Sequence, residues 1–193
     1  MKLTCCLLNA LFLALIMPAI VTPIRAQKVN PDALLIEDFE TRVKDYLKLR
    51  KQVEGKLPHL KPTVSQEAIA HHEREMAERI RKARRGAVQG AIFTPEIAAE
   101  FHRLIGIAMQ GADAGHIHQS LQHAEPVRLR LRINGSYPVG VPLQSTPPTL
   151  LMNLPALPTE LDYRVVGNNL TLRDAKANLI LDFVPNAIPG TGL

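Results

Sequence analysis

Residues 70–76, which read AHHEREM, contain side-chain types that bind metal ions. His72 and Glu73 begin the pattern His-Glu-x-x-His, in which two histidines one helical turn apart hold a zinc ion. Met76 stands where the second histidine would be, and methionine is a poor zinc ligand. The spacing of the neighbouring apolar residues instead predicts an amphipathic helix with Met76 facing the core. We therefore expect His71 and His72 to diverge and Met76 to be buried.

A second histidine-rich group lies between residues 102 and 123. Two of its members form His-x-His, a spacing that puts both side chains on one face of a strand but separates them on a helix. The surrounding sequence reads as helix or loop, which favours surface histidines and no bound cofactor. A metal-assisted hydrolase is the alternative, and its candidate ligands are His102, His116, His118 and His123.

Three arginines alternate with apolar residues in the stretch 127–133, which predicts a strand with one apolar and one cationic face. The cationic face either pairs with aspartates on neighbouring strands or forms a binding surface for an anion or a partner. The strand pattern places the aspartates on mixed faces, which argues against a catalytic carboxylate pair. The arginines are Arg128, Arg130 and Arg132, and the aspartates are Asp162, Asp174 and Asp182.

The densest positive charge lies in residues 79–85, directly after several glutamates. On one helix this order places negative side chains towards the N-terminus and positive ones towards the C-terminus, which the helix dipole stabilises. It also allows the pairs Glu75–Arg79 and Glu78–Lys82. A phosphate-rich or acidic partner is the alternative explanation for this charge.

Other catalytic patterns are missing from the sequence. It contains no Gly-x-Ser-x-Gly motif and no glycine-rich phosphate loop. There is no tryptophan and few aromatic side chains that could stack on bases. We therefore expect no nucleic-acid partner.

The N-terminus has the layout of a secretory signal peptide, with Lys2 before an apolar run and a cleavage position after Ala26. Alternatively, residues 3–24 are just long enough to stay in the membrane as an anchor. Both cysteines, Cys5 and Cys6, lie in this segment, so the mature chain 27–193 would contain no thiol or disulfide. Removing Lys2 and Arg25 lowers the net charge from +5 to +3.

Periodicity and capping residues divide the mature chain into a helical part, 27–125, and a strand-rich part, 126–193. Helices are expected to begin at Asn30, at Thr63 or Ser65, at Thr94 and at Asp113. Further strands are expected at 161–166, 170–174 and 178–184, with residues 167–169 as a hairpin loop. The sequence thus predicts a single α+β domain, in which about four N-terminal helices pack on a small C-terminal antiparallel sheet of three to four strands.

Several short patterns resemble uncharacterised exported bacterial proteins, a family without an assigned activity. They are Phe39-x-x-Arg42-Val43-x-x-Tyr46, residues 92–96, Leu161-x-Tyr163-Arg164 and residues 177–182. The resemblance implies one folded unit in the bacterial envelope, either periplasmic or secreted. We expect a non-enzymatic binding or accessory module whose partner is an envelope protein or an anionic surface. Membrane attachment is expected only if the leader is retained.

Overall fold

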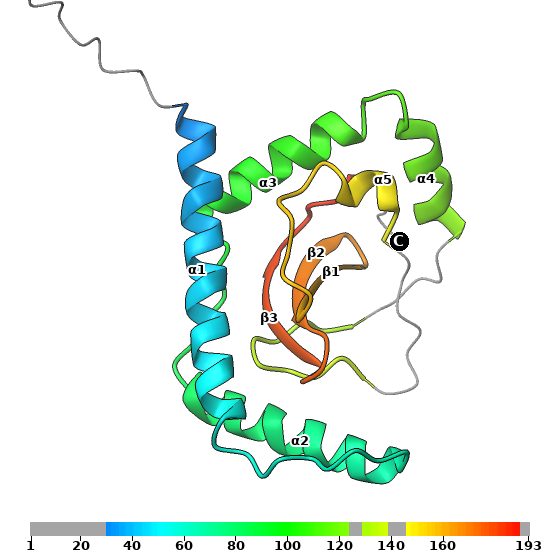
Figure 1. The fold of residues 1–193 in the computed structure, drawn as a ribbon. Coiled ribbons are helices and arrows are strands. Elements are labelled where there is room, and N and C mark those ends of the chain that lie inside the picture. Colours follow the sequence, from blue (N-terminus) through cyan, green and yellow to red (C-terminus); the bar gives the residue numbers. More distant parts are fainter. Residues whose placement is uncertain (1–29, 124–128, 139–145, 190–193) are drawn as a thin grey trace, which may run out of the picture.

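The computed structural model describes residues 30–123, 129–138 and 146–189. Within these residues, five helices precede three strands, which confirms the predicted α+β fold (Figure 1). In Figure 1, α1, α2 and α3 frame the sheet on three sides, and α4 and α5 lie near the far end of α3. The elements are α1 (Pro31–Glu54), α2 (Gln66–Ala83), α3 (Pro95–Ala108), α4 (Ala114–His123), α5 (Pro148–Leu151), β1 (Leu161–Val166), β2 (Asn169–Asp174) and β3 (Leu179–Val184).

Side-chain caps fix the starts of the three long helices, because each satisfies a backbone N–H that has no partner within its helix. Asn30 accepts from the Asp32 N–H at 3.2 Å, and proline follows it at the first helical position of α1. The cap of α2 is Ser65 and not Thr63, and the cap of α3 is Thr94, as predicted. The helix starts were therefore readable from local sequence alone.

The sheet is an antiparallel meander in the order β1-β2-β3. Its first hairpin turns through Gly167, whose φ of 60° suits glycine, and Asn169 already belongs to β2. The hairpin loop is therefore one residue shorter than the sequence suggested.

The strand predicted at 127–133 is wrong for residues 129–133, which pair with no strand; residues 127 and 128 lie outside the described part. The chain meets β3 only after this stretch, where Asn134 donates to the Ile180 carbonyl at 2.8 Å and Ile180 donates to the Gly135 carbonyl at 2.8 Å. Leu129 and Leu131 nevertheless pack inward against Tyr137 and Val166. The alternation of apolar and charged residues in 129–133 reflects burial of one side of the chain, which does not require a hydrogen-bonded strand.

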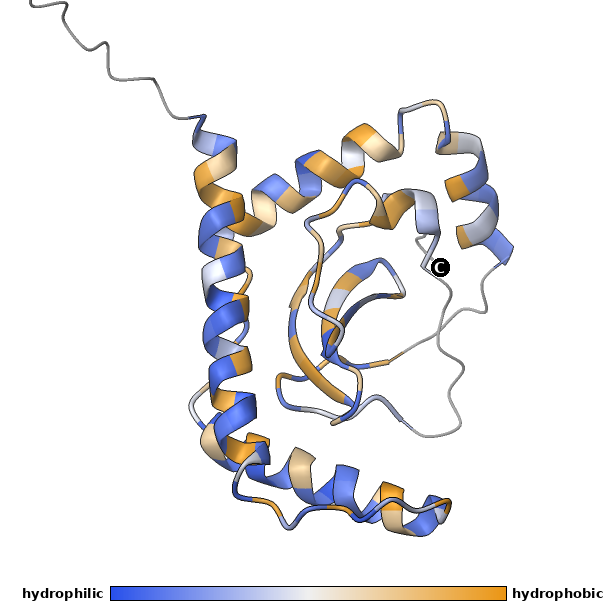
Figure 2. Cartoon of the chain, in the orientation of Figure 1, coloured by the Kyte–Doolittle hydropathy of each residue, from blue (hydrophilic) through white to orange (hydrophobic). Residues whose placement is uncertain are grey.

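The main core lies between the helices and one face of the sheet. Phe39, Phe93 and Phe101 form its aromatic centre, with ring centroids 4.9 to 5.5 Å apart, and Tyr163 of β1 adjoins Phe101. Figure 2 shows the strands as mostly hydrophobic, whereas hydrophilic and hydrophobic residues alternate along α1 and α2. None of the described helices is both long and apolar enough to cross a membrane.

Candidate functional site

The opening near-motif lies on α2, and its methionine faces inward as predicted. Met76 is 2% exposed, whereas His71 is exposed. His72 is half-buried and lines a groove of about 380 Å³ together with His59, a neighbour that the sequence did not indicate. Within the described residues, no group of three His, Cys, Asp or Glu side chains could hold a metal ion.

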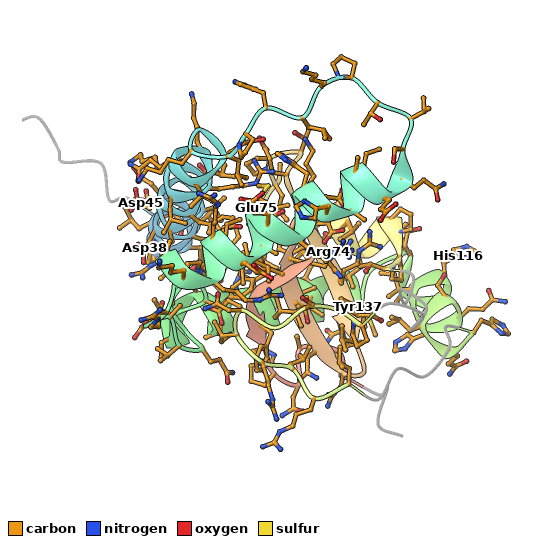
Figure 3. All side chains as sticks on the ribbon, turned by 90° about the horizontal axis from the view of Figure 1, so that it is seen from below. Asp38, Asp45, Arg74, Glu75, His116 and Tyr137 are labelled. Atoms are coloured by element: carbon orange, nitrogen blue, oxygen red, sulfur yellow. The ribbon has the colours of Figure 1, made fainter. Side chains whose placement is uncertain are left out.

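The second histidine group is distributed over exposed helix surfaces. His102 lies on α3, and His116, His118 and His123 lie on α4. Figure 3 shows His116 at the periphery of the molecule. The described structure therefore does not assemble these four side chains into a metal centre.

Of the three arginines predicted to form a binding face, Arg130 and Arg132 are exposed, and Arg128 lies outside the described residues. Within the described residues, neither Arg130 nor Arg132 pairs with a sheet aspartate, and the three carboxylates have other partners. Asp162 accepts from Arg164 and Arg173 on one face of the sheet. Asp174 and Asp182 lie on the opposite face, as expected from the mixed strand pattern. Asp174 bonds to α1, and Asp182 bonds to the loop before α3.

Asp174, at the end of β2, is fully buried and ties the sheet to α1. Its carboxylate accepts from the Tyr46 hydroxyl at 2.6 Å, from Arg50 Nε at 2.9 Å and from the Ala177 N–H at 2.8 Å. Arg50 also reaches Glu54, which is partly exposed, at 3.0 Å. Because a buried charge without a partner is costly, this pair holds α1 in one position on the sheet.

The environment of Tyr46 keeps its hydroxyl protonated. Burial raises the pKa of Tyr46, and the negative charge of Asp174 and the hydrogen bond to it raise that pKa further. Arg84 and Arg50 oppose the shift but are outweighed. The tyrosine therefore acts as a hydrogen-bond donor to Asp174 and is poorly suited to accept or release protons near neutral pH.

Asp182 of β3 is also fully buried and organises the loop before α3. One carboxylate oxygen accepts from the backbone N–H groups of Ile92 at 2.8 Å and Phe93 at 2.9 Å. The other accepts from the Gly90 N–H at 3.0 Å, where glycine adopts a φ of 87°. Three loop donors are thus satisfied by one side chain, which leaves that carboxylate little capacity for a ligand.

The end of α2 is joined to the segment after residue 129 by two arginines. Arg84 donates to Asn134 Oδ1 at 2.8 Å and to the Leu181 carbonyl at 3.0 Å, and its guanidinium lies 5.3 Å from the centre of the Tyr46 ring. Arg81 donates to the Asn134 carbonyl at 3.0 Å and to Ser136 Oγ. Burial lowers the pKa of Arg84, although Tyr46 and Asp182 act in the opposite direction.

The basic run 79–85 therefore has mainly structural uses. The predicted pair Glu75–Arg79 forms at 2.7 Å, but the described residues contain no Glu78–Lys82 pair. Sequence reasoning missed the roles of Arg81 and Arg84, because their partners lie 50 or more residues away. The available signal was a charged residue on an otherwise apolar helix or strand face, as at Arg50 and Asp174.

Comparison of the chain with family models, curated proteins and solved structures finds no match.

Proposed function

We propose that this protein is a non-enzymatic binding or accessory module exported to the bacterial envelope, and that its contact surface is the arginine segment 129–133. The observation that carries the proposal is how the buried charges are used. The buried charges bond between the sheet and the elements packed on it: Arg50 of α1 to Asp174, Arg84 to the Leu181 carbonyl, and the loop before α3 to Asp182. These charged groups therefore maintain the fold.

The arginine segment supports a contact role because it is both exposed and held at several points. Leu129 and Leu131 pack inward, which leaves Arg130 and Arg132 outside. Directly after them, Asn134 exchanges hydrogen bonds with Arg84. Cationic side chains on a fixed backbone lose less conformational entropy on binding than the same side chains on an unanchored chain. An acidic surface of an envelope protein is the complementary partner.

Reversal of the two charges tests the contact surface. We expect the Arg130→Glu/Arg132→Glu protein to fold normally and to recover much less partner in affinity purification from cross-linked bacterial envelopes. The matched control is Lys44→Glu/Lys48→Glu, which reverses two exposed charges on α1. An unchanged set of partners would remove segment 129–133 as the contact surface.

Export is tested separately by cell fractionation and by N-terminal sequencing of the exported product. A new N-terminus near residue 27 supports cleavage of the leader. An intact N-terminus in the membrane fraction supports the anchored alternative, and a cytosolic product would contradict an envelope function.

A further inference from the structure

Asn134 and Gly135 form the one Asn-Gly pair of the sequence, directly after the arginine segment 129–133. In such a pair the backbone nitrogen of the glycine can attack the side-chain carbonyl carbon of the asparagine. Glycine has no Cβ beside that nitrogen, so the approach is less hindered than at any other residue type. Every other asparagine of the chain is followed by a residue with a side chain. Asn134 is therefore the most reactive asparagine in the unfolded chain.

The reaction is a deamidation that consumes only water. The Gly135 backbone nitrogen bonds to Asn134 Cγ, the bond between Cγ and the amide nitrogen breaks, and ammonia leaves with the proton of the Gly135 N–H. Water then opens the cyclic imide that has formed. Opening at the side-chain carbonyl gives aspartate, and opening at the main-chain carbonyl gives isoaspartate, in which the backbone continues through the former side chain.

The folded chain holds both reacting groups of this pair in hydrogen bonds. Asn134 Oδ1 accepts from Arg84 Nη1 at 2.8 Å, and Asn134 Nδ2 donates to the Arg84 carbonyl at 2.9 Å. The Gly135 N–H donates to the Arg132 carbonyl at 2.9 Å. The side chain must give up two bonds before it can turn, and the nitrogen must give up its own before it can lose its proton.

The end of α2 and strand β3 keep this segment in place. Arg84 is 8% exposed and also donates to the Leu181 carbonyl at 3.0 Å. Arg81 donates to the Asn134 carbonyl at 3.0 Å, and the Asn134 N–H donates to the Ile180 carbonyl at 2.8 Å. Figure 1 shows the segment between the end of α2 and the sheet. Asn134 is therefore freed only when the segment separates from both elements.

The fold also requires both residues of the reactive pair. Asn134 has a φ of 61°, a left-handed conformation that asparagine adopts more readily than most residues. At Gly135 an added Cβ would lie 2.9 Å from the Arg132 carbonyl oxygen. The tight turn that anchors the segment thus carries an unavoidable chemical weakness.

We propose that Asn134 is a deamidation site that the folded chain protects and that separation of the segment from α2 exposes. The reaction removes the donor to the Arg84 carbonyl, and isoaspartate adds a methylene group to the backbone before Gly135. The original contacts then cannot re-form, so deamidation permanently marks chains whose segment has opened. The proposal depends neither on export nor on the contact role of segment 129–133, although that segment would lose its anchor in the modified chain.

Peptide mapping by mass spectrometry tests the proposal on the purified protein, incubated at mildly alkaline pH with and without urea. In urea we expect Asn134 to react before every other asparagine and to give both aspartate and isoaspartate. Without urea we expect the reaction at Asn134 to be at least about tenfold slower, because the hydrogen bonds of Asn134 and Gly135 must break first. Gly135→Ala, measured in urea so that its folding does not matter, should slow the reaction.

Two variants separate local opening from unfolding of the whole chain. Arg81→Met removes the donor to the Asn134 carbonyl and should accelerate deamidation in the absence of urea. Thr94→Ala is the matched control, because it removes the cap of α3 and lowers stability without touching Asn134. It should leave the rate at Asn134 nearly unchanged.

Three outcomes would overturn the proposal. Equal rates with and without urea would show that the fold does not protect Asn134. Earlier reaction of another asparagine in urea would show that Asn134 is not the reactive site. Equal acceleration by Arg81→Met and Thr94→Ala would show that unfolding of the whole chain, and not separation from α2, controls the reaction.

Discussion

Replacing Asp174 with asparagine should reveal how strongly the buried ion pair holds α1 on the sheet. The substitution keeps the size of the side chain but removes its charge. Among the described residues, the buried Arg50 then has no anionic partner other than the partly exposed Glu54. One nitrogen of Arg50, Nη2, is already buried without a hydrogen-bond partner, so the guanidinium cannot easily compensate.

The expected loss is about 3 to 5 kcal/mol of unfolding free energy, the usual cost of leaving one member of a buried pair uncompensated. That is a large part of the roughly 5 to 15 kcal/mol available to a typical domain. In a chain of this size it corresponds to a decrease in melting temperature on the order of 10 °C. Removing the cation as well, in Arg50→Met/Asp174→Asn, should restore most of the loss, because no buried charge remains.

The assay is urea unfolding of the four proteins in the double-mutant cycle, followed by circular dichroism, with Glu54→Gln as a control. Glu54 is partly exposed, so its removal should cost less than about 1 kcal/mol. The reasoning is refuted if Asp174→Asn changes stability by less than about 1 kcal/mol. It is also refuted if the loss in the double variant equals the sum of the losses in Arg50→Met and Asp174→Asn, since the two effects would then be independent.

Three further predictions concern other contacts. Asp182→Ala should lower the unfolding free energy by about 2 to 4 kcal/mol, because it leaves three loop N–H donors unsatisfied, and hydrogen exchange of that loop should accelerate. Gly135→Ala should cost about 1 to 3 kcal/mol in urea unfolding, because the added Cβ would lie 2.9 Å from a backbone carbonyl oxygen; Gly86→Ala, with open space, is the control. Burial raises the pKa values of Tyr46 and Tyr163 above the unfolded value of 10.0. The stability gained by keeping both hydroxyls protonated is therefore complete below pH 10.0 and is lost as the pH rises above it. The absorbance of their tyrosinate forms should appear together with unfolding. Ionisation of both side chains in a still-folded chain would contradict this prediction.

The sequence predicted features that depend on a few neighbouring residues. Asn30 and Thr94 cap their helices because a cap needs only the next two or three N–H groups. Met76 was placed correctly because helical periodicity alone assigns it to the buried face. The strand predicted at 127–133 failed in the described part, since alternation reports burial on one side and says nothing about hydrogen-bonding partners.

Long-range polar contacts were beyond prediction for a different reason. Asp174 lies 124 residues from Arg50 and 128 from Tyr46, and no local pattern specifies such a pairing. Arg81 and Arg84 appeared in the sequence as part of a basic run, although both are used to hold the segment around Asn134. The exposure of Arg130 and Arg132 was predicted correctly. The contacts that hold their segment in place depend on residues far away in the sequence and became visible only in the structure.

The most direct test of the proposed function is the amount of envelope partner recovered with Arg130→Glu/Arg132→Glu relative to Lys44→Glu/Lys48→Glu, with equal folding verified by circular dichroism. We predict strongly reduced recovery for the first variant and near-normal recovery for the second. Equal recovery with both variants would contradict a contact role for the arginine segment.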